Sequence, residues 1–131
     1  MANEATCMIN PTRFGRVTIA AGAVIPKGTL IALTDPNTGA ASSADNDVFG
    51  GIAMEESTAA SVVTDLGVAL DGVWALTATA AGITVGQDVT IGGANTIKIY
   101  TTIDDEKGYV VGKALETTAG SETIMVRLKG Y

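Results

Sequence analysis

The sequence contains no histidine, one cysteine and few aromatic residues: one Trp, three Tyr and two Phe. Without histidine, the chain lacks the commonest general base near neutral pH and the commonest metal ligand. Cys7 has no second cysteine for an internal disulfide and no histidine to activate its thiol. We therefore expect a protein that is not an enzyme and that carries no metal or cofactor.

Basic residues are missing from the middle of the chain. None of the eight Lys and Arg residues lies between Lys27 and Lys98, whereas eight of the 14 acidic residues do. An acidic middle repels phosphate, so this pattern argues against a nucleic-acid partner. The basic ends leave two interpretations open, namely contact with an acidic protein partner or an ordinary solvated surface.

Long hydrophobic runs are also absent. No apolar stretch approaches the roughly 20 residues that cross a bilayer. The segment Met1–Asn10 contains Glu4 and no basic residue, which is unlike a signal peptide. These features predict a soluble, unprocessed protein without a membrane partner, made in the cytoplasm.

Acidic residues cluster at Asp45-Asn46-Asp47 and at Asp104-Asp105-Glu106. Neither cluster has the spacing of a calcium-binding EF-hand loop, with its glycine and distal glutamate. We expect solvated loops at both places, and a weak cation site at Asp104–Glu106 stays open as the alternative.

The residues that are present favour short β-strands. Apolar and polar residues alternate from Arg16 onward, and turn-forming residues recur every 8–14 positions. This pattern predicts a mainly β fold, a compact β-barrel or sandwich with at most one or two short helices. Residues 55–63 fit either one or two helical turns or an irregular link. The nine expected strands cover residues 16–20, 29–34, 48–54, 66–70, 73–79, 88–91, 96–102, 109–115 and 123–129.

Two short phrases occur twice. Ala20-Ala21-Gly22 returns as Ala80-Ala81-Gly82 after 60 residues, and the segment 48–55 returns as 109–116 after 61 residues. The similar offsets predict an internal pseudo-repeat that makes most of the chain one pseudo-symmetric β unit. Within the second phrase, Gly50-Gly51 suggests a bulge or a close backbone approach.

Two turn signals predict hairpins. Asp71-Gly72 separates the expected strands 66–70 and 73–79, and the segment 92–95 separates 88–91 from 96–102. Such Gly-containing turns commonly join antiparallel neighbours.

We expect residues 1–14 to form an N-terminal arm that is flexible in the isolated chain, and residues 15–131 to form a single β-rich domain. Met8, Ile9, Pro11 and Phe14 are the candidate binding residues of the arm, and simple terminal disorder is the alternative. Trp74 is either a core residue after a tight turn or an anchor at a subunit interface.

A series of short motifs follows in order between residues 15 and 131: Gly22, Lys27-Gly28, Phe49-Gly51-Ile52-Ala53, Leu70-Asp71-Gly72-Val73-Trp74, Gly86-Asp88-Val89, Gly112-Lys113-Ala114 and Val126-Arg127-Leu128. In order and spacing the series resembles the capsid cement, or head decoration, proteins of tailed bacteriophages. This group is related in fold to the head decoration protein of phage lambda.

The resemblance implies a structural virion protein on the outer surface of the capsid. Its homotrimers would bind at local three-fold axes of the expanded head and stabilise the major capsid protein shell against the pressure of packaged DNA. The arm at residues 1–14 would bind the capsid, often by adding a strand. The runner-up is another β-rich assembly or surface module, such as a tail, fibre, pilus or carbohydrate-binding subunit. A sugar binder would show several exposed aromatic residues in one patch, and a pilus subunit would carry a secretion leader.

Overall fold

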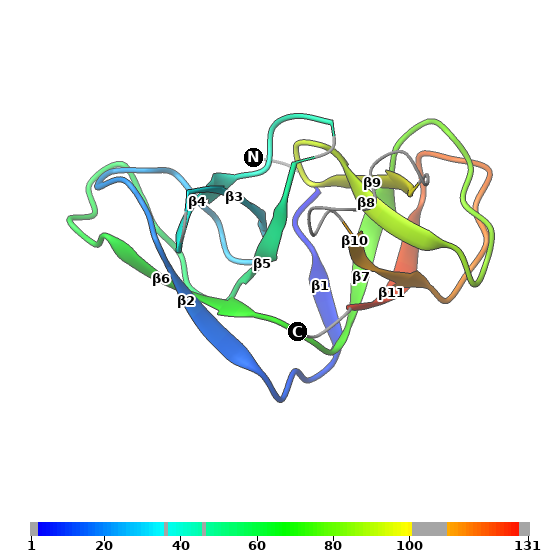
Figure 1. The fold of residues 1–131 in the computed structure, drawn as a ribbon, viewed down its shortest axis with the longest axis horizontal. Coiled ribbons are helices and arrows are strands. Elements are labelled where there is room, and N and C mark those ends of the chain that lie inside the picture. The colour runs from blue at the N-terminus through cyan, green and yellow to red at the C-terminus, as the bar shows by residue number, and fades with distance from the viewer. Residues whose placement is uncertain (1–2, 36, 46, 101–109, 129–131) are drawn as a thin grey trace.

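The computed structural model describes residues 3–35, 37–45, 47–100 and 110–128 (Figure 1). The described residues form eleven β-strands and no helix, which confirms the predicted mainly β class. The strands build two small barrels that lie side by side (Figure 1).

The first barrel contains five strands in the closed order β2-β4-β3-β5-β6. Neighbouring strands are antiparallel except for β2 and β4, which pair in parallel at Thr18 and Thr38. The strands are β2 (Phe14–Thr18), β3 (Leu30–Asp35), β4 (Thr38–Ala41), β5 (Phe49–Ala53) and β6 (Asp65–Ala69).

The second barrel repeats this topology. Its strands follow the order β7-β11-β10-β8-β9, and a parallel pairing of β9 with β7 at Thr96 and Thr77 completes the ring. The strands are β7 (Val73–Ala78), β8 (Asp88–Gly93), β9 (Thr96–Ile99), β10 (Val110–Ala114) and β11 (Thr123–Leu128). The remaining strand, β1 (Thr6–Ile9), pairs with the first half of β7.

The pairing registers show which residues of the two barrels correspond. Gly15 lies opposite Val68, and Trp74 lies opposite Val126, so Gly15 and Trp74 occupy the same place in the repeat. The offsets are 59 residues for β2 and β7, 61 for β5 and β10, and 58 for the other strand pairs. The internal pseudo-repeat predicted from the sequence is therefore confirmed, and it covers nearly every strand.

Only the second of the repeated phrases lies at corresponding positions. Ile25 bridges Ser57, and Ile83 bridges Thr118, so the corresponding residues here are 58 positions apart. Ala20-Ala21-Gly22 and Ala80-Ala81-Gly82 are 60 apart and fall at different places in their loops. The first phrase is thus a chance likeness of two Gly-containing loops.

The glutamates that end the second phrase perform the same structural role in each barrel. Glu55 Oε1 accepts the backbone N–H of Gly67 at 2.6 Å, and Glu116 Oε1 accepts that of Met125 at 2.8 Å. Each carboxylate thus holds the chain that leaves β5 or β10 against β6 or β11. The phrase repeats because both barrels need the same side-chain contact at this edge.

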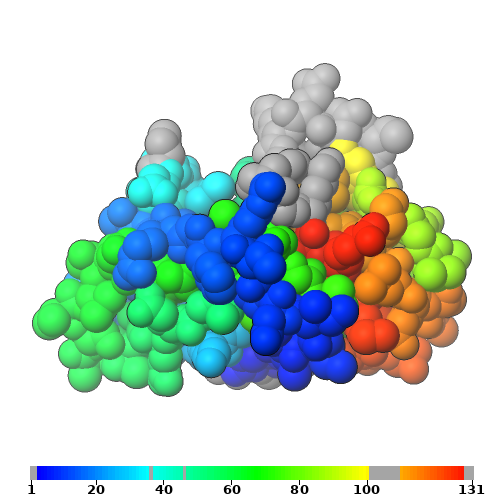
Figure 2. Space-filling view, turned by 90° about the horizontal axis from the view of Figure 1, so that it is seen from below, coloured from blue at the N-terminus to red at the C-terminus, as the bar shows by residue number. Residues whose placement is uncertain are grey.

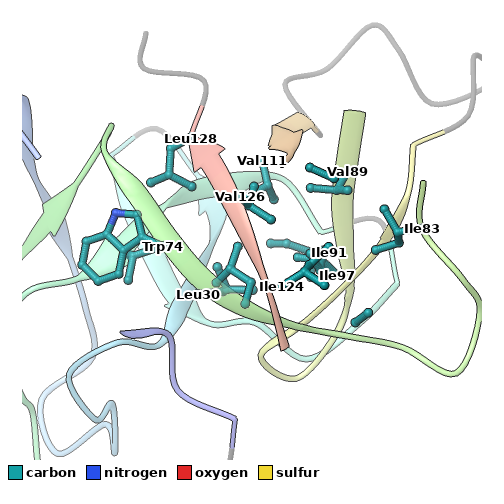
Figure 3. Packing of buried hydrophobic residues seen from close by; sticks show 14 of the residues in the cluster. Leu30, Trp74, Ile83, Val89, Ile91, Ile97, Val111, Ile124, Val126 and Leu128 are labelled. Atoms are coloured by element: carbon teal, nitrogen blue, oxygen red, sulfur yellow. The ribbon is translucent and has the colours of Figure 1, made fainter. Parts of the chain in front are cut away.

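The hydrophobic core has two parts. One cluster lies inside the first barrel. The larger one fills the second barrel and continues across the junction to Leu30, Ile52 and Ala69 of the first (Figure 3). The two barrels therefore share buried apolar surface.

Polar contacts join the barrels at the turn between β8 and β9. The buried Asn95 Oδ1 accepts the backbone N–H of Leu30 at 2.9 Å, and Ser42 Oγ accepts the N–H of Asn95 at 3.0 Å. Lys98 forms an ion pair with Asp45 in the same region. A single turn of the second barrel thus satisfies backbone groups of the first.

Two strands and one turn differ from the prediction. β1 and β4 were not expected, because Thr38–Ala41 carries only small residues and Thr6–Ile9 lies in the expected arm. The predicted hairpin at Asp71-Gly72 is wrong, since β6 and β7 belong to different barrels. The turn instead connects the barrels. Residues 55–63 form turns and one bridge at Ser57, without a helix.

Two other turn predictions are confirmed. β8 and β9 form an antiparallel hairpin around residues 92–95. At Gly50-Gly51 the register shifts by a bulge, and a Cβ on Gly51 would lie 2.9 Å from the side chain of Val68. This is the close approach that the paired glycines suggested.

Candidate partner-binding surfaces

The N-terminal segment lies on the surface between the two barrels (Figure 2). β1 is antiparallel to β7, with Cys7 opposite Trp74, and the N–H of Ala5 donates to the carbonyl of Gly28 in the first barrel. The segment expected to be flexible is therefore placed as a strand from Thr6 to Ile9, because the edge of β7 offers it backbone partners.

Three of the four candidate arm residues project large apolar side chains to solvent. Met8 is 53% exposed, Ile9 61% and Phe14 60%. Pro11 follows β1 and packs against the turn at Gly72. Exposed apolar side chains so near one another in sequence suit contact with another protein.

Asp71 fixes the link between β1 and β2. Its carboxylate accepts the hydroxyl and backbone N–H of Thr12, both at 2.7 Å, and the N–H of Arg13 at 2.9 Å. The hydrogen bond from the Thr12 hydroxyl, followed by that from the Arg13 backbone, lowers the pKa of Asp71 below its usual range. The predicted hairpin turn is thus an anchor for the N-terminal segment.

Trp74 lies in the core of the second barrel and is 3% exposed. Its Nε1–H donates to the carbonyl of Asp71 at 3.0 Å, which satisfies the one polar group of the indole. Of the two interpretations from the sequence, this position matches the core one. The indole offers no face to a neighbouring subunit in this conformation.

A charged cluster covers the outer face of β2 and β6. The guanidinium of Arg16 forms ion pairs with Asp65 and, at 3.4 Å, with Glu55. The hydrogen bond and the charge of Asp65 raise the pKa of Arg16. All three side chains are about half exposed, so the cluster balances charge on this face and contributes little stability.

The carboxylates of the first acidic cluster have partners within the fold. Asp47 accepts the backbone N–H groups of Ser43 and Ala44, and Asp45 pairs with Lys98. The other cluster, Asp104–Glu106, lies outside the described residues. Within the described parts of the chain, no three His, Cys, Asp or Glu side chains gather as a candidate metal site.

Sequence reasoning missed a groove at one end of the first barrel. It has a volume of about 240 Å³ and opens beside β2, between Gly15, Leu33, Gly50 and Leu70. The signal available in the sequence was the replacement of large residues by glycine: Gly15 and Gly50 correspond to Trp74 and Val111. That comparison requires the register of the repeat, which only the pairings supply.

No family model and no curated protein matches the chain. Along the stretches that the structure describes, no helix is long and apolar enough to cross a membrane.

Proposed function

We propose that this chain is a structural virion protein, a capsid cement protein that binds the outside of an expanded phage head. Homotrimers at local three-fold axes would stabilise the major capsid protein shell against internal DNA pressure. One observation carries the proposal most directly. Of the eight large hydrophobic side chains that are exposed among the described residues, three fall within residues 8–14.

The fold supports this proposal by its rigidity. Two closed barrels leave few unpaired strand edges, and their shared core and the buried contact of Asn95 with Leu30 hold them together. A cement protein needs such a rigid body, because it has to resist displacement of the shell proteins that it bridges. Three apolar segments on one trimer would also bind together far more tightly than one alone.

The experiment mixes the purified chain with expanded, undecorated heads of its phage and measures bound copies by sedimentation. We expect saturation at three copies for each local three-fold axis and a higher temperature of head disruption. Absence of binding would refute the proposal and favour another β-rich assembly.

The role of the apolar segment is tested by Ile9→Asp. We expect about tenfold weaker head binding or more, because each trimer loses three apolar contacts at once. The matched control is Val62→Asp, which places the same charge at a residue 88% exposed in a loop of the first barrel. Equal binding of the two variants would remove residues 8–14 from the contact.

A further inference from the structure

The two barrels differ at one corresponding edge. In the second barrel, β7 has neighbours along its whole length on the side away from β11, because β1 pairs with Val73–Ala75 and β9 with Thr77–Ala78. In the first barrel, β4 pairs with β2 only at Thr18. Among the described residues, no strand pairs with Phe14–Arg16 on this side.

The free edge of β2 presents backbone groups for hydrogen bonding. The N–H of Thr18 donates to the carbonyl of Asn37, away from β6. Because strand residues alternate in direction, the N–H and C=O groups of Arg16 and Phe14 point the same way. These groups correspond to those of β7 that β1 occupies.

The groove of the first barrel opens beside this free edge. Gly15 stands where the second barrel has Trp74, and Gly50 stands where it has Val111. Figure 3 shows Trp74 and Val111 packed within the second core with Val126 and Leu128. The counterparts of those two residues, Val68 and Leu70, line the groove instead. The first barrel thus lacks an aromatic side chain that the second supplies from its own strand.

We propose that the edge Phe14–Arg16 and the adjoining groove form a docking site for an extended, uncharged segment of a partner protein. The segment would lie antiparallel to β2, as β1 lies on β7. Its residue opposite Gly15 would be aromatic or branched aliphatic, because directly opposed residues share a face and this side chain points into the groove.

The second barrel and the local charge both indicate this occupant. The strand seated on the corresponding edge, Thr6–Ile9, is extended and has no charged residue. At the docking site, the positive charge of Arg16 is already balanced by Asp65 and Glu55. An uncharged segment is therefore the electrostatic complement, and a groove of about 240 Å³ accommodates one large apolar side chain. The proposal does not depend on a capsid being the partner.

The test uses the ¹⁵N-labelled full chain and a capped peptide with the sequence of residues 5–10 carrying Cys7→Trp. We expect saturable shifts of the amide signals of Phe14–Arg16 and slower exchange of the Phe14 and Arg16 amide protons. A control peptide carrying Cys7→Gly should bind at least tenfold more weakly. Shifts at Val73–Ala75 alone, or no shifts, would overturn the proposal.

Two pairs of variants locate the site. Gly15→Trp supplies the missing indole, and its Cβ would meet only the flexible Leu70 side chain, at 3.3 Å. We expect at least tenfold weaker peptide binding, with Ala40→Trp on the outer face of the same barrel as control. Phe14→Pro removes one edge N–H that β6 does not use, and Phe14→Ala is its control. Unchanged binding by both Gly15→Trp and Phe14→Pro would overturn the proposal.

Self-association is the remaining outcome. If the Phe14–Arg16 signals shift with protein concentration in the absence of peptide, a second copy occupies the edge. That result would replace the partner protein proposed here.

Discussion

Asn95 allows a quantitative test of how the barrels are joined. The residue has φ of 53° and is 1% exposed, and its side chain accepts the N–H of the fully buried Leu30. Asn37 holds the corresponding turn of the first barrel at φ 57°, but it is exposed to solvent. The repeat thus offers the same backbone conformation with and without the junction contact.

Substitution with glycine keeps the left-handed conformation and removes only the side chain. Asn95→Gly leaves the Leu30 N–H buried without this acceptor, which costs about 1–3 kcal/mol of unfolding free energy. Asn95→Ala adds about 1–2 kcal/mol of backbone strain, for a total of about 2–5 kcal/mol. At the exposed site, we expect Asn37→Ala to cost only the strain, about 1–2 kcal/mol, and Asn37→Gly to be near neutral.

The assay is urea unfolding, followed by the fluorescence of Trp74 for the second barrel and by far-ultraviolet circular dichroism for both. Coincident transitions in the unchanged protein would show that the barrels unfold together. If Asn95→Gly destabilises no more than Asn37→Gly does, the hydrogen bond to Leu30 contributes nothing and the proposed joining of the barrels through this turn is refuted.

Two further predictions concern the anchor of the N-terminal segment and one glycine. The pKa of Asp71 is lowered in the fold, so its hydrogen bonds to Thr12 stabilise the protein fully above the ordinary pKa of 3.8. This stabilisation is lost as the pH falls through the lowered value. The urea midpoint of Asp71→Asn should therefore lie below that of the unchanged protein at pH 6 and approach it at pH 2; an equal gap at both values would contradict the role. Gly112→Ala should destabilise at least twice as much as Gly86→Ala in the same assay, because its Cβ would overlap the backbone carbonyl of Arg127 whereas Gly86 has open space. Equal losses would show that the backbone yields at Gly112.

The β class and the repeat could be predicted because both depend on local signals. Alternation of apolar residues from Arg16 onward and regular turn residues indicate short strands whatever their partners. The phrase ending in Glu55 and Glu116 repeats because each glutamate binds a backbone N–H at the same place in its barrel. Eight of the nine predicted strands overlap one observed strand each, and the remaining one, 16–20, overlaps the end of β2.

The pairing of strands could not be predicted, because backbone hydrogen bonds carry no mark in the sequence. Asp71-Gly72 has hairpin chemistry, yet its flanking strands find their partners in different barrels. β1 and β4 become strands only because an edge of β7 or β3 lies beside them. Their own residues are too small or too irregular to indicate it.

The sequence by itself determined an all-β chain with an internal repeat and apolar residues at Met8, Ile9 and Phe14. Only the tertiary structure decided that the repeat forms two closed barrels and that Trp74 is buried. It also decided that one barrel edge carries β1 while its counterpart beside Gly15 stays open. The physical reason is that a side-chain pattern specifies which face of a strand is buried, whereas the neighbour of each strand depends on long-range closure of the barrel.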